Sequence, residues 1–247
     1  MSVPHDLFDE DYLYFYARTL TDERCDAETA SIIRLLELAP GMRVLDVPCG
    51  EGRIAGRLAR QGCDVVGIDV NEQFLALARE RHPEAAFEHG DMRALKHRGE
   101  FDAVVNWFTS VGYFDVATND AVLAGFARVL SPGGRLLIDL QNPDRIARLA
   151  APAHGTFASV TEREGDLMVD RVSYHPPEPF SHSTRYMVRG GDVRKIEFSL
   201  EQIPAPQLIE RLQQTGFSDV QLVGRSGEPF TPQSARMIAL ARRSASL

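Results

Sequence analysis

The length, composition and charge of the chain exclude several classes of protein. Its 247 residues are too many for one minimal domain and too few for two full domains of roughly 150 residues each. Hydrophobic residues make up 44% and charged residues 25%, which excludes a collagen-like, coiled-coil or disordered chain. A formal charge of -8 disfavours nonspecific attraction to a phosphate backbone, so we expect no nucleic-acid partner.

Cysteine usage and hydropathy predict a cytoplasmic protein. Cys25, Cys49 and Cys63 have neither the even number of a disulfide framework nor the spacing of a zinc site, so we expect no bound metal. The N-terminal stretch MSVPHDLFDEDYLYFY lacks the cationic start and apolar run of a signal peptide. Because no stretch approaches 18 continuous apolar residues, we also expect no membrane partner.

Apolar periodicity predicts alternating helices and strands through the first 150 residues. A helix begins after Thr21 and ends at Pro40-Gly41. Strands follow at 44–47, 65–68, 85–87, 103–105 and 136–140, with helices at 53–61, 72–81 and 119–130 between them. Strands alternating with helices of this length imply right-handed crossovers and a parallel sheet covered on both faces, which is a doubly wound α/β domain.

The pattern changes after Leu149. Residues 152–203 alternate polar and apolar residues and contain hairpin signals, which predicts antiparallel strands near 156–163, 167–174, 180–189 and 193–201. A helix at 206–215 and strands at 217–224 and 235–241 then return the chain to the main sheet. The predicted organisation is an N-terminal aromatic arm and helix at 1–39, a core at 40–151 and 204–247, and a small antiparallel β insertion, or cap, at 152–203.

The most informative motif is a glycine-rich stretch, VLDVPCGEGRIAGRLA, at residues 44–59. Gly50 and Gly52 follow a predicted strand and precede a predicted helix, where the backbone passes close to a ligand and helix-start N–H groups can hold an anion or carboxylate. With Ala55 three residues later, the same spacing also fits a dinucleotide fingerprint, so a nicotinamide-dependent oxidoreductase stays open.

Acidic residues at the ends of three predicted strands help to separate these interpretations. Asp46, four residues before Gly50, would oppose a pyrophosphate but suits the ammonium group of an amino-acid ligand. Asp69 ends the second strand, and its two oxygens suit the paired hydroxyls of a ribose. Asp91 and Met92 end the third strand, where a carboxylate can accept from an exocyclic amine and a thioether can lie on adenine. Together these sites predict a ligand that is a nucleoside carrying a zwitterion.

These motifs resemble those of class I S-adenosylmethionine-dependent methyltransferases over about residues 40–142. LDVPCGEGR resembles the glycine-rich motif of the family, GIDV its ribose-binding acid and HGDM its adenine-binding turn. NWFTSVGYF resembles the segment that borders the transferred methyl group, and VLSPGGRLLIDL resembles the turn into the fifth strand. The resemblance implies a Rossmann-like seven-stranded sheet with an antiparallel last strand, S-adenosylmethionine as cofactor and S-adenosylhomocysteine as product.

An aromatic cluster in the arm is expected to act as a lid over the cofactor. Tyr12 and Tyr16 stand one helical turn apart, and their rings can face a sulfonium cation while their phenols anchor its carboxylate. With the motifs above, the residues assigned to the cofactor are Tyr12, Tyr16, Asp46, Gly50, Gly52, Arg53, Asp69, Val70, Asp91, Met92, Asn106 and Phe108.

Methyl transfer from a sulfonium needs alignment and, for a hydroxyl or protonated amine, a base. The candidate bases are Tyr16, Tyr113, His175 and His182, of which we select Tyr16, Tyr113 and His182 as catalytic residues. The segment Asn106-Trp107-Phe108-Thr109 lacks the two prolines typical of enzymes that methylate exocyclic amines of DNA bases. Base methylation is therefore disfavoured.

The cap resembles that of small-molecule methyltransferases, including sugar N-methyltransferases. Six basic against eight acidic side chains in residues 152–203 do not make an RNA-binding platform, and the strand edges favour a homodimer through the cap. The leading hypothesis is methyl transfer to N or O of a small metabolite, such as a sugar or secondary metabolite. An RNA or protein methyltransferase and a non-catalytic S-adenosylmethionine-binding module remain as alternatives.

Overall fold

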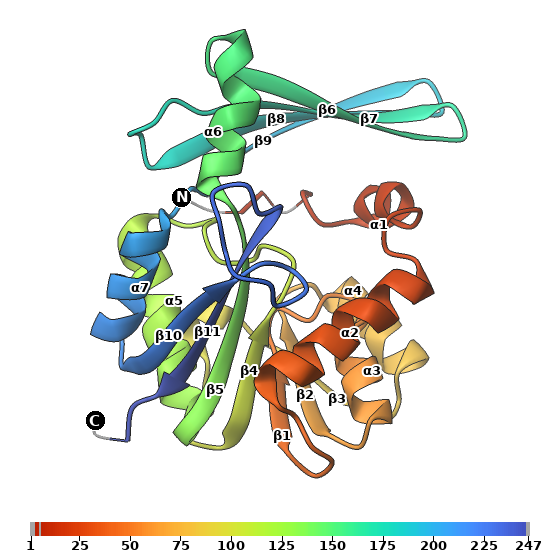
Figure 1. Cartoon of the computed structure of the whole chain (residues 1–247). Coiled ribbons are helices and arrows are strands. Elements are labelled where there is room, and N and C mark those ends of the chain that lie inside the picture. Colours follow the sequence, from red (N-terminus) through yellow and green to blue (C-terminus); the bar gives the residue numbers. More distant parts are fainter. Residues whose placement is uncertain (1–2, 5, 246–247) are drawn as a thin grey trace.

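Among the residues that the computed structural model describes, 3–4 and 6–245, seven strands form one twisted sheet at the centre of the larger part of the molecule (Figure 1). The ends of the predicted segments 1–39 and 204–247, and residue 5, lie outside the described residues. The strands are β1 (Arg43–Asp46), β2 (Asp64–Asp69), β3 (Ala86–His89), β4 (Phe101–Asn106), β5 (Leu130–Gln141), β10 (Phe217–Val223) and β11 (Arg236–Arg243).

The strand order is β10-β11-β5-β4-β1-β2-β3. Neighbouring strands pair in parallel from β3 to β5, whereas β11 runs antiparallel to both β5 and β10. Val44 is paired with Val65 on one side and Ala103 on the other, so the apolar runs predicted from the sequence lie side by side. The predicted fold class, a doubly wound sheet with an antiparallel last strand and a separate antiparallel β insertion, is confirmed.

Alternation along each strand divides the apolar side chains between two cores. In β1, Val44 packs with Ile32 of α2 (Asp22–Leu36) and with α3 (Ala55–Arg60) on one face of the sheet. Leu45, the next residue, packs on the other face with α5 (Val116–Val129), including Phe126, and with α7 (Ala205–Gln214). Both faces of the parallel sheet are therefore covered, which keeps the strand ends at one edge as the place for a ligand.

Short polar side chains begin most of the helices. Thr21 caps α2, Asn71 caps α4 (Glu72–Arg81) and Asp115 caps α5, each accepting a hydrogen bond from a backbone N–H two or three residues later. The start of α5 lies at Val116 rather than near Asn119, because the cap at Asp115 satisfies the first turn. Two further helices were not predicted: α1 (Glu10–Tyr16), capped by Asp9, and α6 (Pro143–Ala150), capped by Asn142.

A second sheet of four antiparallel strands forms the cap at the top of Figure 1. Its strands are β6 (Thr156–Arg163), β7 (Asp166–Ser173), β8 (Phe180–Arg189) and β9 (Asp192–Glu201), in the order β6-β7-β8-β9. Helix α6 and the 3-10 turn η2 (Ala151–Ala153) lead into it from β5, and β9 runs back into α7. A further 3-10 turn, η1 (Met92–Ala94), follows β3.

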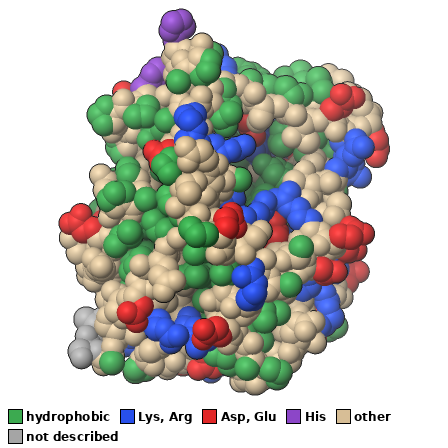
Figure 2. All heavy atoms as spheres, in the orientation of Figure 1, with side chains coloured by type: hydrophobic (Ala, Val, Ile, Leu, Met, Phe, Trp, Pro, Cys, Tyr) green, Lys and Arg blue, Asp and Glu red, His purple; other side chains and the backbone are tan. Residues whose placement is uncertain are grey.

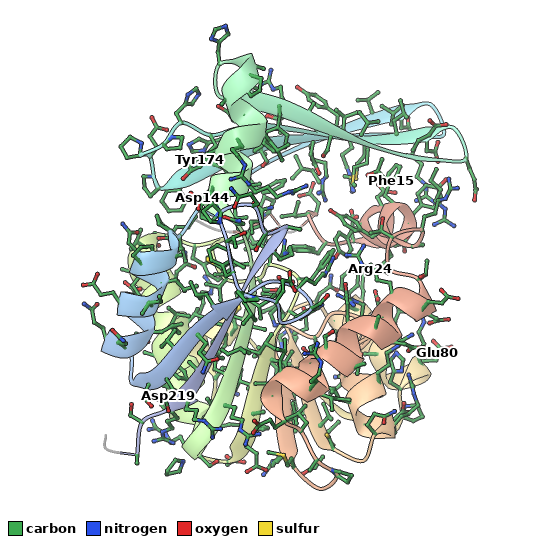
Figure 3. All side chains as sticks on the ribbon, viewed as in Figure 1. Phe15, Arg24, Glu80, Asp144, Tyr174 and Asp219 are labelled. Carbon is green, nitrogen blue, oxygen red and sulfur yellow. The ribbon has the colours of Figure 1, made fainter. Side chains whose placement is uncertain are left out.

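The arm, which we define as residues 3–16 apart from residue 5, lies between the cap and the core (Figure 1). Leu7 and Phe15 from the arm form an apolar cluster with Met168, Met187 and Ile196 of the cap. Phe15 of α1 is fully buried and lies on the side of that helix that faces the cap sheet in Figure 3. The cap therefore holds the arm against the carboxyl ends of the core strands.

Candidate functional site

A cavity of about 900 Å³ lies at the carboxyl ends of β1, β2 and β4, beneath the arm. Open α/β sheets bind ligands at this edge. Among its lining residues are ten of those predicted from the sequence: Tyr12, Asp46, Gly50, Arg53, Asp69, Val70, Asp91, Met92, Phe108 and Tyr113.

Three of the predicted cofactor residues do not line this cavity. Gly52 has φ +80, and a Cβ there would stand 2.8 Å from the Phe87 ring, so glycine permits the loop to pack against β3. Asn106 is fully buried, and its Nδ2 donates to the Val47 carbonyl at 2.7 Å, which joins the ends of β4 and β1. Tyr16 stacks its ring on Tyr12 at 4.5 Å. These three residues therefore support the residues of the cavity wall without lining the cavity themselves.

The end of β2 is tied to the glycine loop. Asp69 accepts from the Gly50 N–H at 2.8 Å and from the Asn71 N–H at 2.9 Å, and Gly50 adopts φ +54. Burial raises the pKa of the Asp69 carboxyl, although these N–H groups oppose the shift. The acid predicted to bind ribose therefore also holds the loop in shape.

Asp46 is the most perturbed acid of the cavity. It is buried at the end of β1 and accepts from the Ala55 N–H at 3.1 Å. Burial raises its pKa to about 7, the charge of Arg53 opposes that shift, and Asp69 adds to it. Because an arriving cation stabilises such a carboxylate, Asp46 suits the ammonium group of the predicted cofactor.

Asp91 stays charged at the cavity wall. Its carboxylate accepts from the Arg93 guanidinium at 2.5 to 3.0 Å, and these hydrogen bonds lower the pKa of Asp91. The Arg93 guanidinium in turn lies 4.9 Å from the centre of the Phe114 ring. The predicted adenine-side acid is thus held in place by a stacked arginine, with Met92 beside it in the lining.

A cluster around Glu28 was not predicted from the sequence. The buried Glu28 carboxylate accepts from Arg53 and Arg225, both at 2.7 Å, from Arg24 at 2.9 Å and from the Trp107 indole at 2.9 Å (Arg24 is labelled in Figure 3). Burial alone would raise the pKa of Glu28, but Arg53 and the other donors hold it below its ordinary value. One carboxylate facing three guanidinium groups leaves positive charge at the end of the cavity that Arg53 lines, which suits a carboxylate on the ligand.

The loop after β4 is held in a strained backbone conformation. Phe108 and Thr109 have φ of 68° and 59°, which non-glycine residues rarely adopt. The Phe108 N–H donates to the fully buried Asp139 carboxylate at 3.0 Å, and Arg236 bonds both Asp139 and the Thr109 hydroxyl. The guanidinium of Arg53 then lies 5.2 Å from the Phe108 ring, so this strain places an aromatic face in the cavity.

The candidate bases differ in their placement. Tyr113 lines the cavity, but burial raises the pKa of its phenol, which keeps it protonated at neutral pH and disfavours it as a base. The Tyr16 hydroxyl accepts from Arg185 of the cap at 3.4 Å. His182 is exposed and bonds Ser199 at 2.8 Å. By strand alternation its ring points to the opposite face of the cap from Arg185, so it is not placed to take a proton in this cavity.

The arm is fastened to the cap by charged pairs at the start of α1. Arg194 lies 2.5 Å from Asp9 and 2.9 Å from Asp11, and Arg189 lies 2.6 Å from Asp11. The Tyr14 ring is flanked by Arg163 and Arg189, whose guanidinium groups lie 4.2 and 4.1 Å from its centre. Since Asp9 and Tyr12 line the cavity, these contacts hold its cover closed.

Replacing Asp11 by asparagine is expected to speed dissociation of S-adenosylhomocysteine by about three- to tenfold, because it removes the charge that holds Arg189 and Arg194. A stopped-flow chase of bound S-adenosylhomocysteine measures this rate. Glu10→Gln, the same change one residue earlier on α1, serves as the matched control. Equal rates in the two variants would contradict a lid held by these pairs.

Metal ligands and membrane spans are not evident in the described part of the chain. Nowhere in residues 3–4 and 6–245 do three or more His, Cys, Asp or Glu side chains gather in a way that suits a metal ion. None of the helices described is long and apolar enough to span a bilayer.

Comparison with known proteins identifies methyltransferases as similar in sequence. A family model described as a methyltransferase domain matches residues 44–134. The chain is 32% identical over 129 residues to dTDP-3-amino-3,4,6-trideoxy-alpha-D-glucopyranose N,N-dimethyltransferase from Streptomyces venezuelae, which covers 52% of this chain and 54% of that protein. The chain thus spans little more than half the length of this relative and of a second sugar N,N-dimethyltransferase.

Two longer matches complete the comparison. A putative methyltransferase from Bacillus subtilis is 32% identical over 187 residues, covering 71% of this chain and 73% of that protein. The S-adenosylmethionine-bound structure of an amino pentose methyltransferase from Micromonospora echinaspora superposes with a TM-score of 0.67 and 21% identity, covering 98% and 100% of the two chains. At that identity, the structural likeness concerns the fold alone.

Proposed function

Because the chain belongs to the S-adenosylmethionine-dependent methyltransferase family, we propose that it transfers a methyl group to the amine nitrogen of a small hydroxylated metabolite such as an amino sugar. The observation that carries the proposal is the pair of buried acids, Asp46 and Asp69, at neighbouring strand ends around the Gly50 loop. The names of two relatives, both N,N-dimethyltransferases of dTDP-linked amino sugars, support the acceptor class.

The residues of the cavity fit the cofactor. Asp46 suits its ammonium group, the Glu28 cluster supplies positive charge for its carboxylate, and Asp69 has two oxygens for its ribose. When bound, S-adenosylmethionine supplies an electrophilic methyl group on a sulfonium. The chain then contributes alignment and exclusion of water, through the arm above and the strained Phe108 loop beside the cavity.

If the acceptor is an amine, methyl transfer does not require a strong catalytic base in the protein. Tyr113 carries a protonated phenol, which can donate a hydrogen bond or accept one but does not take a proton at neutral pH. An amine that arrives neutral needs no base before transfer, and the proton that it loses afterwards can leave to solvent. This favours nitrogen over a sugar hydroxyl, which requires a strong base.

Macromolecular acceptors fit less well. The net charge of -8 opposes nucleic acid, and Figure 2 shows arginines and carboxylates side by side over the face in view rather than gathered into one basic patch. We propose no nucleic-acid or membrane partner and place the protein in the cytoplasm, in keeping with its three free, buried cysteines. A homodimer through the cap remains part of the proposal.

Two experiments test the proposal. Calorimetry measures binding of S-adenosylmethionine and S-adenosylhomocysteine, and an assay with labelled methyl measures transfer to a panel of amino sugars and matched hydroxyl sugars. We expect micromolar binding, weakened by Asp69→Asn, and transfer to amines in preference to hydroxyls. Absence of binding, or binding displaced by NAD, would overturn it. Binding without transfer to any acceptor would favour a non-catalytic cofactor-binding module, and transfer to RNA or protein would favour the other alternative.

A further inference from the structure

A second cavity, of about 420 Å³, adjoins the cofactor cavity beneath the cap. Val3, Pro4 and Tyr113 line both cavities, so the two meet at the Tyr113 ring. The remaining walls are residues 182–184 of β8 and 197–199 of β9. A molecule whose reacting group lies beside the cofactor can therefore extend past Tyr113 into this space.

The walls of the second cavity combine aromatic rings with neutral hydrogen-bonding groups. Phe198 and Tyr113 have ring centres 6.1 Å apart, and Ser183 is the strand partner of Phe198 on the same face of the cap. Strand alternation turns the side chains of His182 and Glu197 to the opposite face, so these residues border the cavity chiefly with their backbone. In the described part of the chain β9 is an edge strand, so the N–H and C=O groups on its outer side, apart from the Glu201 N–H that donates to Gly112, have no partner strand and are available to ligand hydroxyls.

Among the described residues, no arginine or lysine lines the second cavity, so its walls offer no cationic side chain to a phosphate. Two arginines line the cofactor cavity, Arg53 and Arg93, and each is bonded to a carboxylate, Glu28 and Asp91 respectively. Among the described residues, the acidic side chains of the two linings are Asp6, Asp9, Asp46, Glu51, Asp69, Glu72, Asp91 and Glu197. Several of these acids already pair with arginine or lysine, so the charge beside the cofactor cavity is mixed. In the second cavity, the lack of a lining cation disfavours a diphosphate, because nothing there compensates the loss of its hydration.

We propose that the second cavity binds the non-reacting part of the acceptor, and that this part is an uncharged, hydroxylated group such as a sugar ring or glycoside without phosphate. The inference rests on the proposed function, since it uses the cofactor cavity as the place of the reacting amine. What it adds is the chemical nature of the group that carries the amine. Tyr113 and Phe198 provide an apolar surface for that group, while Ser183 and the edge of β9 provide hydrogen bonds.

Binding to the full chain loaded with S-adenosylhomocysteine tests this inference by calorimetry. The two probes are methyl 3-amino-3-deoxyglucoside and the dTDP derivative of the same amino sugar. We expect the glycoside to bind at least about tenfold more tightly than the nucleotide-linked sugar. Equal or tighter binding of the nucleotide-linked sugar would overturn the inference, as would failure of both probes to bind.

A matched pair of variants locates the binding. Ser183→Leu fills the second cavity and is expected to weaken glycoside binding by at least about tenfold while leaving S-adenosylhomocysteine affinity unchanged, since Ser183 does not line the cofactor cavity. Ser173→Leu makes the same change on the neighbouring strand β7, at the position paired with His182 and thus on the other face of the cap. Unaltered glycoside binding in Ser183→Leu would refute the site. If Ser183→Leu is unstable, glycoside binding is measured with Ser183→Val instead, with the same expected loss.

Failure of the inference can be told apart from failure of the proposed function. Methylation of an amine that carries phosphate would sustain the function and overturn the inference. Loss of S-adenosylmethionine binding or of all transfer to amines would overturn the function, and the glycoside binding measured above would still decide what the second cavity accepts.

Discussion

Replacing Glu28 by glutamine is expected to lower the free energy of unfolding by about 3 to 5 kcal/mol, which is the range for removal of one partner from a buried ion pair. The Glu28 side chain is 4% exposed and receives Arg24, Arg53 and Arg225. Glutamine keeps the shape of the side chain but turns one acceptor oxygen into an N–H₂ donor that faces guanidinium donors. The variant therefore leaves buried positive charge without its counterion.

Urea denaturation of the Glu28→Gln variant measures the loss, and Asp26→Asn is the matched control on the same helix. Asp26 pairs with Arg57 at 2.6 Å, but its side chain is 70% exposed, so we expect the control to cost no more than about 1 kcal/mol. The pKa of Glu28 lies below its ordinary value, so its stabilising contribution is present above the ordinary glutamate pKa and is lost as the pH falls through the lowered value. Equal destabilisation by the two substitutions would contradict the role of this cluster.

Local patterns predicted the sheet and the glycine loop because both depend on neighbours in the sequence. The apolar runs of β1 and β2, with Gly50 and Asp69 at their ends, can be recognised locally, and pairing of the two strands then brings the Asp69 carboxylate to the Gly50 N–H. A charged residue within the apolar run LLIDL was a further signal, since Asp139 is fully buried and bonds the loop at Phe108.

Other parts of the site depend on contacts between distant segments. Arg24 and Glu28 stand four residues apart on α2, a helical pair that the sequence shows. Arg53 and Arg225 reach Glu28 only through contacts between distant segments, of which spacing along the chain gives no sign. The placement of His182 outside the cofactor cavity has a different origin. Strand β8 was expected, but which of its two faces meets the core depends on how the arm packs, and one residue of register turns a side chain from one face to the other.

The helix in the arm depends on packing against the cap rather than on its own sequence pattern. Helix α1 has only seven residues, too short to be stable alone, and its aromatic residues do not indicate a helix by themselves. Phe15 and Leu7 become buried against Met187 of the cap, and that burial stabilises the helix over the cavity. The lid is therefore a joint property of the arm and the cap.

Asp46→Asn is expected to weaken S-adenosylmethionine binding by about 10- to 100-fold at pH 7.5, because we propose that this buried carboxylate pairs with the cofactor's ammonium group. In the wild-type protein the pKa of Asp46 is about 7, set by burial and opposed by Arg53. A bound cation lowers that pKa, so binding releases a proton when the carboxyl starts protonated. Affinity is then greatest above pH 7 and falls by up to about tenfold per unit below it.

Calorimetry between pH 5.5 and 7 in buffers of different ionisation enthalpy measures this release. The α-amino group of the cofactor stays protonated throughout that window, since its ordinary pKa is about 7.7 to 8.0. The wild-type protein should release close to one proton at pH 6, and Asp46→Asn should release none and bind weakly at every pH. Asp64→Asn, at the exposed start of β2, should behave as the wild type. A flat wild-type profile would show that the Asp46 carboxyl does not meet the ammonium group.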